Sequence, residues 1–293
     1  MTASTVKFER KDIGSAAVQF PTGSAMPDPL DVAVDPYAPT KRTQGMKVRG
    51  FQAWPQKGGP FPAVIILHER WGLTQHFQEM TFRLAEHGYV ALVVNQYSRT
   101  GGGVASEAAH ADQLMAKVNL PSLMQDLTAA IEYLNYQDYV KKNRIAVLGF
   151  DMGAFYALNF AASRRQLRGC IAFYGKVPLD ALATLRCPVL YHQAEHDDIV
   201  SAREVEALCQ KLLAQNVKCE VHKYPGTKHG FFNISRPEDY QAQAAEEAWQ
   251  RTLTFLDEYI LADHAGVRPL PDSQRTFQWL CAKRVGPTGQ RVK

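Results

Sequence analysis

Asp151 lies in the segment Gly149-Phe150-Asp151-Met152-Gly153, where its type and surroundings suit nucleophilic chemistry. An apolar run over residues 144–148 precedes this segment, and a helix-like stretch over 154–161 follows it. This layout is typical of a nucleophile elbow, a strand-to-helix turn that holds a reactive side chain above a sheet. The flanking glycines allow close approach of the backbone, and the residue between them is forced into a strained conformation that Asp tolerates better than most. The usual occupant is Ser, so the chemistry depends on what a carboxylate does there.

Two further segments supply the acid and the imidazole of a triad. Asp197 follows an apolar strand, where a carboxylate is placed to orient an imidazole, and His229 lies in a loop after a later strand. The chain order nucleophile, acid, histidine is that of such triads, and open α/β sheets build their sites in loops at the carboxyl ends of strands. Asp198 is an alternative acid, but we prefer Asp197. A helix-capping role for Asp151 is the competing interpretation, which the glycines and the later pair disfavour.

A carboxylate at the elbow favours a different reaction from a thiol or a hydroxyl. Carboxylates are ionised at neutral pH, whereas a thiol needs activation, so Asp151 needs no base for its attack. Attack on an ester carbonyl would give a reactive mixed anhydride, but displacement at a saturated carbon gives an alkyl-enzyme ester. His229, oriented by Asp197, would then activate water to hydrolyse that ester. The sequence therefore predicts a hydrolase with an Asp-His-Asp triad and Asp151 as covalent nucleophile.

Alternating strand and helix patterns predict the frame that positions these residues. Strand-like segments cover residues 46–54, 61–67, 88–94, 145–148, 169–174, 188–192 and 218–224. Helical patterns cover residues 76–87, 120–135, 202–215 and 239–260. This alternation predicts an α/β fold with a mostly parallel central sheet and helices on both faces.

The ends of the chain differ in composition from its middle. Residues 1–44 lack a sustained period and are expected to form an extended N-terminal arm that packs on the body or makes a homodimer contact. Residues 45–262 are expected to form the α/β domain and residues 263–293 a C-terminal tail. The N-terminus has no apolar core of signal-peptide length, and no segment is apolar enough to span a bilayer.

Composition excludes several classes of partner. The 33 basic and 29 acidic residues are well mixed and give a net charge of +4, without the basic stripe of a nucleic-acid-binding protein or a membrane-seeking run. Five scattered cysteines lack metal-type spacing, which predicts free thiols in a reducing cytoplasm. We expect a cytoplasmic protein that acts on a small molecule, with no metal, cofactor, nucleic-acid or membrane partner.

The chain resembles the dienelactone hydrolase family over residues 45–260. The resemblance rests on Leu67-His68-Glu69-Arg70-Trp71-Gly72, on Asn95-Gln96-Tyr97-Ser98-Arg99, on the elbow, and on the Asp197 and His229 segments. It implies an α/β-hydrolase fold without a large lid domain. It also implies roles for four residues: Glu69 beside the nucleophile, the backbone N–H groups of Met152 and Arg70 as the oxyanion hole, and Arg99 as a holder of a substrate carboxylate. Trp71, near the expected oxyanion hole, is a candidate substrate-binding residue, with packing as its alternative role.

The chain departs from the family pattern at two positions. The nucleophile is Cys in dienelactone hydrolases and Ser in many relatives, whereas this chain has Asp151. Asn233 stands four residues after the histidine, where the family has an arginine. This second departure affects the substrate-anion site, so the substrate need not be a dienelactone.

Glu69 beside Asp151 poses an electrostatic problem. Two carboxylates in a small site cannot both ionise cheaply. Either one is protonated near neutral pH, or a cation such as Arg70 or Arg99 separates them. A protonated Glu69 would be able to serve as an acid toward a leaving oxygen.

Three functional interpretations follow. The first is a hydrolase that uses Asp151 as nucleophile on a small organic substrate such as a haloacid, an epoxide or an activated lactone. The second is an ester or lactone hydrolase of the carboxymethylenebutenolidase type whose Cys or Ser is replaced by Asp, naturally or by engineering. The third is a non-catalytic small-molecule-binding protein, which the retained Asp197, His229, Glu69 and Arg99 disfavour.

Overall fold

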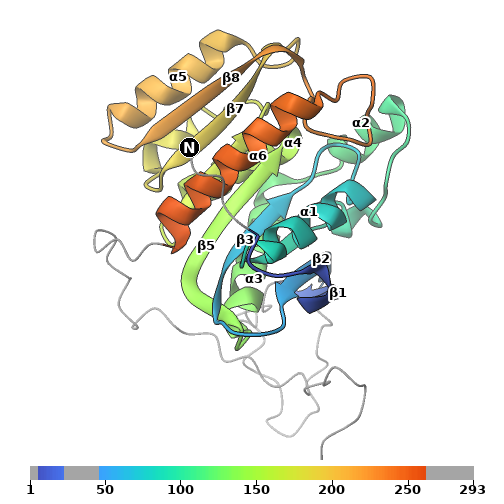
Figure 1. The fold of residues 1–293 in the computed structure, drawn as a ribbon. Coiled ribbons are helices and arrows are strands. Elements are labelled where there is room, and N and C mark those ends of the chain that lie inside the picture. The colour runs from blue at the N-terminus through green and yellow to red at the C-terminus, as the bar shows by residue number, and fades with distance from the viewer. Residues whose placement is uncertain (1–5, 23–45, 262–293) are drawn as a thin grey trace, which may run out of the picture.

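The computed structural model describes residues 6–22 and 46–261 (Figure 1). Its centre is an eight-stranded sheet in the order β1-β2-β4-β3-β5-β6-β7-β8. The strands are β1 (Ile13–Pro21), β2 (Lys47–Pro55), β3 (Phe61–Leu67), β4 (Val90–Val94), β5 (Val140–Phe150), β6 (Gly169–Phe173), β7 (Val189–His196) and β8 (Cys219–Lys228). Strands β3 to β8 pair in parallel, while β1 with β2 and β2 with β4 pair antiparallel.

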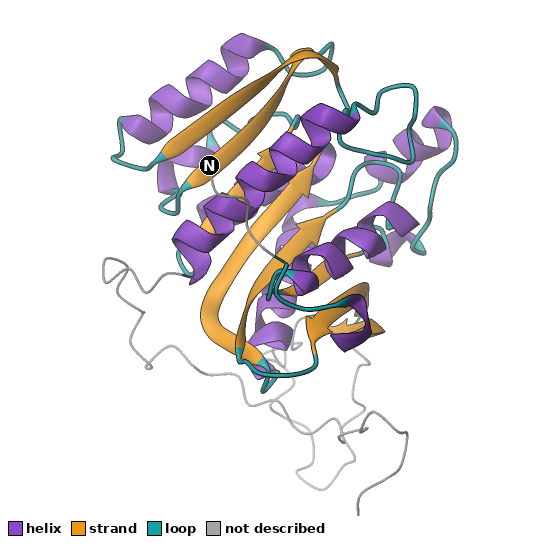
Figure 2. Cartoon of the chain, viewed as in Figure 1, coloured by secondary structure: helices purple, strands orange, loops and turns teal. Residues whose placement is uncertain are grey.

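Helices cover both faces of the sheet (Figure 2). Side chains of α1 (Gln75–Glu86) and α6 (Ala242–Leu256) form one buried cluster with one face of the strands. Side chains of four other helices form the cluster on the opposite face: α2 (Ala108–Ala116), α3 (Leu120–Tyr136), α4 (Met152–Ser163) and α5 (Ala202–Leu213). Shorter helical segments are η1 (Arg10–Asp12), η3 (Ser98–Thr100), η4 (Ala181–Thr184) and the π-helical η5 (Asp257–Leu261).

Strand β3 shows why the central strands are continuously apolar. Val64 and Ile66 point into the cluster under α1 and α6, and Ile65 and Leu67 point into the opposite cluster. A strand covered on both faces buries every side chain, so its sequence does not alternate between apolar and polar residues. The buried strands bring their carboxyl ends to one edge of the sheet, where the loops that follow them meet.

The predicted α/β architecture, a mostly parallel sheet with helices on both faces, is confirmed. Some elements differ from the sequence-based expectation. Strand β5 begins at Val140, earlier than expected, and β7 and β8 extend to His196 and Lys228. Helix α2 was not predicted. The added residues of β5, β7 and β8 include charged and polar side chains. A prediction from apolar runs alone therefore makes each strand shorter than its backbone hydrogen bonding shows it to be.

The first strand lies within the segment that was expected to form an extended N-terminal arm. Residues 13–21 form β1, which pairs along its whole length with β2 at the sheet edge. Its sequence begins Ile-Gly-Ser-Ala-Ala. Such small side chains do not give the alternation of apolar and polar residues that indicates a strand. Residues 1–5, 23–45 and 262–293 lie outside the described residues, so the rest of the predicted arm, its dimer contact and the predicted tail stay predictions.

Candidate active site

The Asp151 turn has the strained geometry expected of an elbow. Asp151 connects the end of β5 to the start of α4 with a φ of 51°, in the region that favours glycine. A Cβ atom at Gly149 would collide with the carbonyl oxygen of Gly153, and one at Gly153 would collide with that of Leu67. The glycines therefore allow α4 to approach the sheet and lift the Asp151 side chain above the strand edge.

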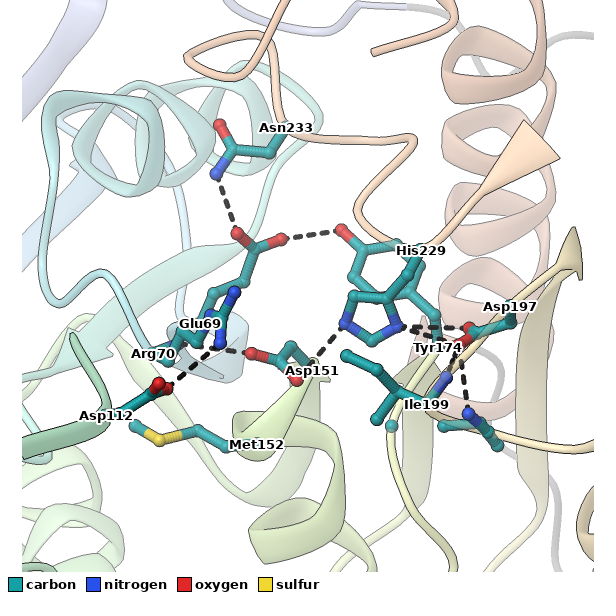
Figure 3. Close-up of polar contacts among 12 residues, drawn as sticks. Glu69, Arg70, Asp112, Asp151, Met152, Tyr174, Asp197, Ile199, His229 and Asn233 are labelled. Atoms are coloured by element: carbon teal, nitrogen blue, oxygen red, sulfur yellow. Dashed lines mark hydrogen bonds and ion pairs between the residues drawn. The ribbon is translucent and has the colours of Figure 1, made fainter. Parts of the chain in front are cut away.

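Three loops bring Asp151, His229 and Asp197 together (Figure 3). His229 Nε2 lies 3.2 Å from Asp151 Oδ1, and His229 Nδ1 lies 3.1 Å from each carboxylate oxygen of Asp197. Asp197 Oδ1 also accepts the backbone N–H groups of Ile199 and Val200, each at 2.9 Å. The carboxylate that contacts the imidazole is thus that of Asp197, the acid preferred over Asp198.

The two carboxylates fix the charge of the imidazole. Burial acts to lower the pKa of His229, but hydrogen bonds and ion pairing with Asp151 and Asp197 outweigh it and raise the pKa to about 10. Burial also pushes the pKa of Asp197 upward, but the His229 contact and the backbone N–H groups hold it below its usual value. At neutral pH the site therefore holds an imidazolium between two aspartates.

One of the two expected oxyanion donors faces the second oxygen of Asp151. The backbone N–H of Arg70 donates to Asp151 Oδ2 at 3.4 Å. Met152 is the first residue of α4, so its N–H has no carbonyl one turn earlier in the helix with which to pair. The Asp151 carboxylate thus has one oxygen toward the imidazole and one toward a backbone donor.

His68, which the sequence-based reading left out of the site, fixes the peptide that carries this donor. Its Nδ1 lies 2.7 Å from the carbonyl oxygen of Glu69, and its Nε2 accepts the backbone N–H of Gln96 at 3.1 Å. These partners specify a neutral ring with the proton on Nδ1. The Glu69 carbonyl and the Arg70 N–H belong to one planar trans peptide and point in opposite directions. By holding the carbonyl, His68 aims the Arg70 N–H at Asp151.

Glu69 is buried at 2% exposure and is held by two donors. The Tyr174 hydroxyl donates to Oε1 and Asn233 Nδ2 donates to Oε2, each at 2.7 Å. Burial and then the Asp151 charge raise the pKa of Glu69 to about 7, against these two hydrogen bonds. Glu69 is therefore protonated over part of the neutral range, as one of the two sequence-based alternatives required.

The two arginines that were expected near the carboxylates pair with other acids. Arg99 binds the carboxylate of Asp126 through Nε and Nη2, with the closest contact at 2.6 Å, and donates to Thr22. Asp126 is buried. The Arg70 guanidinium lies 3.0 Å from Asp112 of α2. The described contacts of Arg99 do not join it to the triad: its Nε and Nη2 groups donate to the buried Asp126 carboxylate and to Thr22.

Arg236 is a basic residue near this region that sequence reasoning missed. Its guanidinium lies 3.3 Å from the ring centre of Trp71, and that of Arg70 lies 4.8 Å from the same ring. Arg236 also donates to the carbonyl oxygen of Ser106. Trp71, expected in substrate binding, thus carries an arginine from each of two loops. Arg236 lies three residues beyond Asn233, the position at which the family has an arginine, so the family pattern does not point to it.

Tyr174 is the other residue that was missed. It follows β6 directly, with a φ of 39°, and its ring lies 5.1 Å from that of His229. A residue that directly follows a buried parallel strand lies at the carboxyl end of the sheet, where the triad residues also lie. The position of Tyr174 after β6 was therefore the feature of the sequence that pointed to the site. A tyrosine in an apolar context gave no indication of the Glu69 contact.

A separate cavity of about 420 Å³ lies between α1, α6 and the loop after His229. It contains neither the triad nor Glu69 in its lining, so we do not assign it to the reaction. Among residues 6–22 and 46–261, no group of three or more His, Cys, Asp or Glu side chains is arranged to hold a metal ion. No described helix is both long and apolar enough to cross a membrane.

Comparisons with known proteins agree with this architecture. The family model described as "Dienelactone hydrolase family" matches residues 48–260. A candidate carboxymethylenebutenolidase of Escherichia coli O157:H7 is 30% identical over 260 residues, covering 84% of this chain and 95% of its own. The crystal structure of a candidate dienelactone hydrolase from Klebsiella pneumoniae has a TM-score of 0.72 at 25% identity, covering 84% of this chain and 99% of its own. A dienelactone hydrolase-like promiscuous phosphotriesterase from metagenomic libraries, at 20% identity, shares the fold with a TM-score of 0.70 and covers 85% of this chain and 99% of its own.

Proposed function

The chain belongs to the dienelactone hydrolase family and is a hydrolase, and from this premise we propose that Asp151 is its covalent nucleophile. The observation that carries the proposal is the placement of the Asp151 carboxylate, with His229 Nε2 at 3.2 Å from one oxygen and the Arg70 N–H at 3.4 Å from the other. This is the arrangement that an Asp nucleophile needs, because its ester must later be attacked by water next to an oxyanion donor.

In the first step, an oxygen of Asp151 attacks a saturated carbon of the substrate. The new bond is a C–O ester bond, and the leaving group departs with its electron pair. Where the leaving atom is oxygen, as in an epoxide, a proton donor is required. Glu69 is suited to this role because its pKa, raised to about 7, keeps a proton available near neutral pH.

Esterification changes the charge next to His229. While Asp151 is ionised, two carboxylates hold the imidazole in its protonated form, which cannot act as a base. The ester is neutral, so one of the two carboxylate charges that raise the His229 pKa is lost in the intermediate. After losing its proton to solvent, His229, oriented by Asp197, takes a proton from water.

The resulting hydroxide attacks the carbonyl carbon of the Asp151 ester. The oxyanion of the tetrahedral intermediate is stabilised by the N–H groups of Arg70 and Met152. As the intermediate collapses, the departing alkoxide takes the proton from His229 and leaves as the alcohol product. The new Asp151 carboxyl group then gives its proton to His229, which restores the carboxylate and the imidazolium of the resting site. Every group in this cycle is present in the described site.

We propose a small organic substrate that carries an anionic group. Arg236, whose guanidinium lies over Trp71 and 3.8 Å from the exposed carboxylate of Glu238, joins Arg99 as a candidate anion-binding residue. Haloacids and acidic epoxides combine such an anion with a displaceable group at a saturated carbon.

A second candidate is hydrolysis of an ester or lactone of the carboxymethylenebutenolidase type. The names of the curated relatives favour it, together with the oxyanion donor at the elbow. On this alternative Asp151 stands where a Cys or Ser would act, and turnover is silenced because a carboxylate transfers acyl groups poorly.

A paired hydrolysis assay tests the two candidates. The protein, Asp151→Cys and Asp151→Ala are each given short aryl esters, a dienelactone, haloacids and epoxides. The proposal expects the protein as it stands to release halide or open an epoxide and Asp151→Ala to be inactive. Ester or lactone cleavage by Asp151→Cys alone would instead support the second candidate.

A further inference from the structure

Two cysteines outside the site lie against one another. Cys209 Sγ, on α5, lies 2.7 Å from Sγ of Cys219, the first residue of β8. A disulfide bond is about 2.05 Å long, so a small movement would bring the sulfur atoms to bonding distance. Both cysteines are half-buried, whereas Cys170 and Cys187 are fully buried. The pair is therefore the most accessible to a small oxidant among the described cysteines.

We propose that Cys209 and Cys219 form a disulfide bond when the protein meets a peroxide or a low-molecular-weight disulfide, and that the bond fastens α5 to the edge strand β8. Nothing in this proposal depends on the reaction at Asp151. The pair is a modification site, and the ten-residue spacing of its members matches no metal or redox motif.

The chemistry balances with the oxidant named. With hydrogen peroxide, one cysteine sulfur attacks a peroxide oxygen to give a sulfenic acid and water. The second sulfur then attacks the first, the S–S bond forms, and a second water leaves. Two S–H bonds and the O–O bond are broken, and two electrons pass from the sulfurs to the peroxide. With oxidised glutathione, exchange through a mixed disulfide releases two glutathione thiols.

The environment of Cys219 sets the expected rate. Burial and the neighbouring Cys209 sulfur raise the pKa of the Cys219 thiol above its usual value. Since the thiolate is the attacking form, bond formation is expected to be slow near neutral pH and faster at alkaline pH. Once formed, the disulfide bond joins α5 and β8, two elements that already pack against each other.

The position of the pair predicts stabilisation rather than inhibition. Strand β8 pairs on one side with β7 and forms the edge of the sheet. Side chains of α5 pack with Cys219 and Val221 in the same hydrophobic cluster. Cys219 and His229 lie at opposite ends of β8, on the order of 30 Å apart along an extended strand. The bond therefore strengthens the edge and leaves the triad geometry unchanged.

Peptide mapping of the full chain tests the proposal. The purified protein is reduced, exchanged into alkaline buffer and treated with hydrogen peroxide or oxidised glutathione. We expect the loss of two free thiols, a non-reduced peptide that joins Cys209 to Cys219, and a rise in Tm on the order of 5 °C that dithiothreitol reverses. Activity per molecule is expected to be the same in both forms.

Two cysteine variants, one in the pair and one outside it as a control, accompany the peptide mapping. Cys209→Ser should abolish both the cross-linked peptide and the Tm shift, whereas Cys187→Ser should retain them. If a variant does not fold, the mapping of the unsubstituted protein still decides. Full alkylation of Cys209 and Cys219 after oxidation, a cross-link between any other cysteines, or an unchanged Tm would overturn the proposal.

Discussion

The His229 imidazole lies 3.2 Å from Asp151 Oδ1 while its other nitrogen contacts both oxygens of Asp197. In the resting site the imidazole is therefore an imidazolium between two carboxylates, with a pKa raised to about 10. A base held in its acid form is inactive until one neighbouring charge is removed. In the proposed cycle, alkylation of Asp151 removes that charge immediately before His229 is needed as a base.

This ion pairing predicts a pH dependence of stability. The folded-state pKa of His229 is raised from 6.5 to about 10, so its stabilising contribution is fully present below 6.5 and is lost as the pH rises through about 10. The free energy of unfolding of the protein should fall over this window relative to His229→Gln. Denaturant titrations of both proteins, across the window, measure the difference. Parallel curves would show that His229 is not paired in this way.

The raised pKa of Glu69 predicts that the free energy of unfolding also changes with pH, in a lower pH range than for His229. Its folded-state pKa is raised from 4.5 to about 7, so the folded protein binds more protons than the unfolded chain between these values. The free energy of unfolding contributed by this group therefore falls as the pH rises from 4.5 to about 7. Glu69→Gln should remove this slope. Asn233→Ala, which deletes a donor to the carboxylate, should move the window upward; an unmoved window would contradict the role of that hydrogen bond.

His68 is predicted to act as a positioning residue for the oxyanion hole. His68→Leu removes the donor to the Glu69 carbonyl and should lower kcat by about 10²-fold, with KM little changed. His68→Gln retains a donor and an acceptor and should keep most of the activity. Steady-state kinetics on the best substrate of the panel, with Tm measured alongside, separate this effect from unfolding. Equal losses in the two variants would argue against positioning.

We predict that Arg236 contributes to substrate binding and that Arg99 contributes to the stability of the fold. Arg236→Gln should raise KM for a carboxylate-bearing substrate while leaving KM for its uncharged amide unchanged. Arg99→Gln leaves the buried Asp126 carboxylate without its partner and should destabilise the fold by on the order of 1–3 kcal/mol, with little effect on KM. Kinetics on the acid and amide pair, with denaturant unfolding of both variants, check this. The reverse pattern would return the anion site to Arg99.

The sequence predicted those parts of the site that local patterns encode. Glycine spacing around Asp151 and the positions of Asp197 and His229 after strands were sufficient, because parallel strands bring their carboxyl ends together. Contacts between loops were beyond such reasoning. The pairing of Arg99 with Asp126 was not foreseen because Asp126 lies on a helix that the sequence does not tie to it, and the role of Arg99 toward a substrate stays a prediction. The contacts of Arg236 with Trp71 and of Tyr174 with Glu69 join residues more than one hundred positions apart.

The most direct test of the covalent nucleophile is a single turnover in water enriched in heavy oxygen. Excess protein is mixed with the best substrate, digested, and the peptide that contains Asp151 is weighed by mass spectrometry. We expect the mass gain of one heavy oxygen in the Asp151 carboxylate, because water attacks the carbonyl carbon of the ester. Heavy oxygen in the product alone, with Asp151 unlabelled, would show that water attacks the substrate directly and would contradict the mechanism.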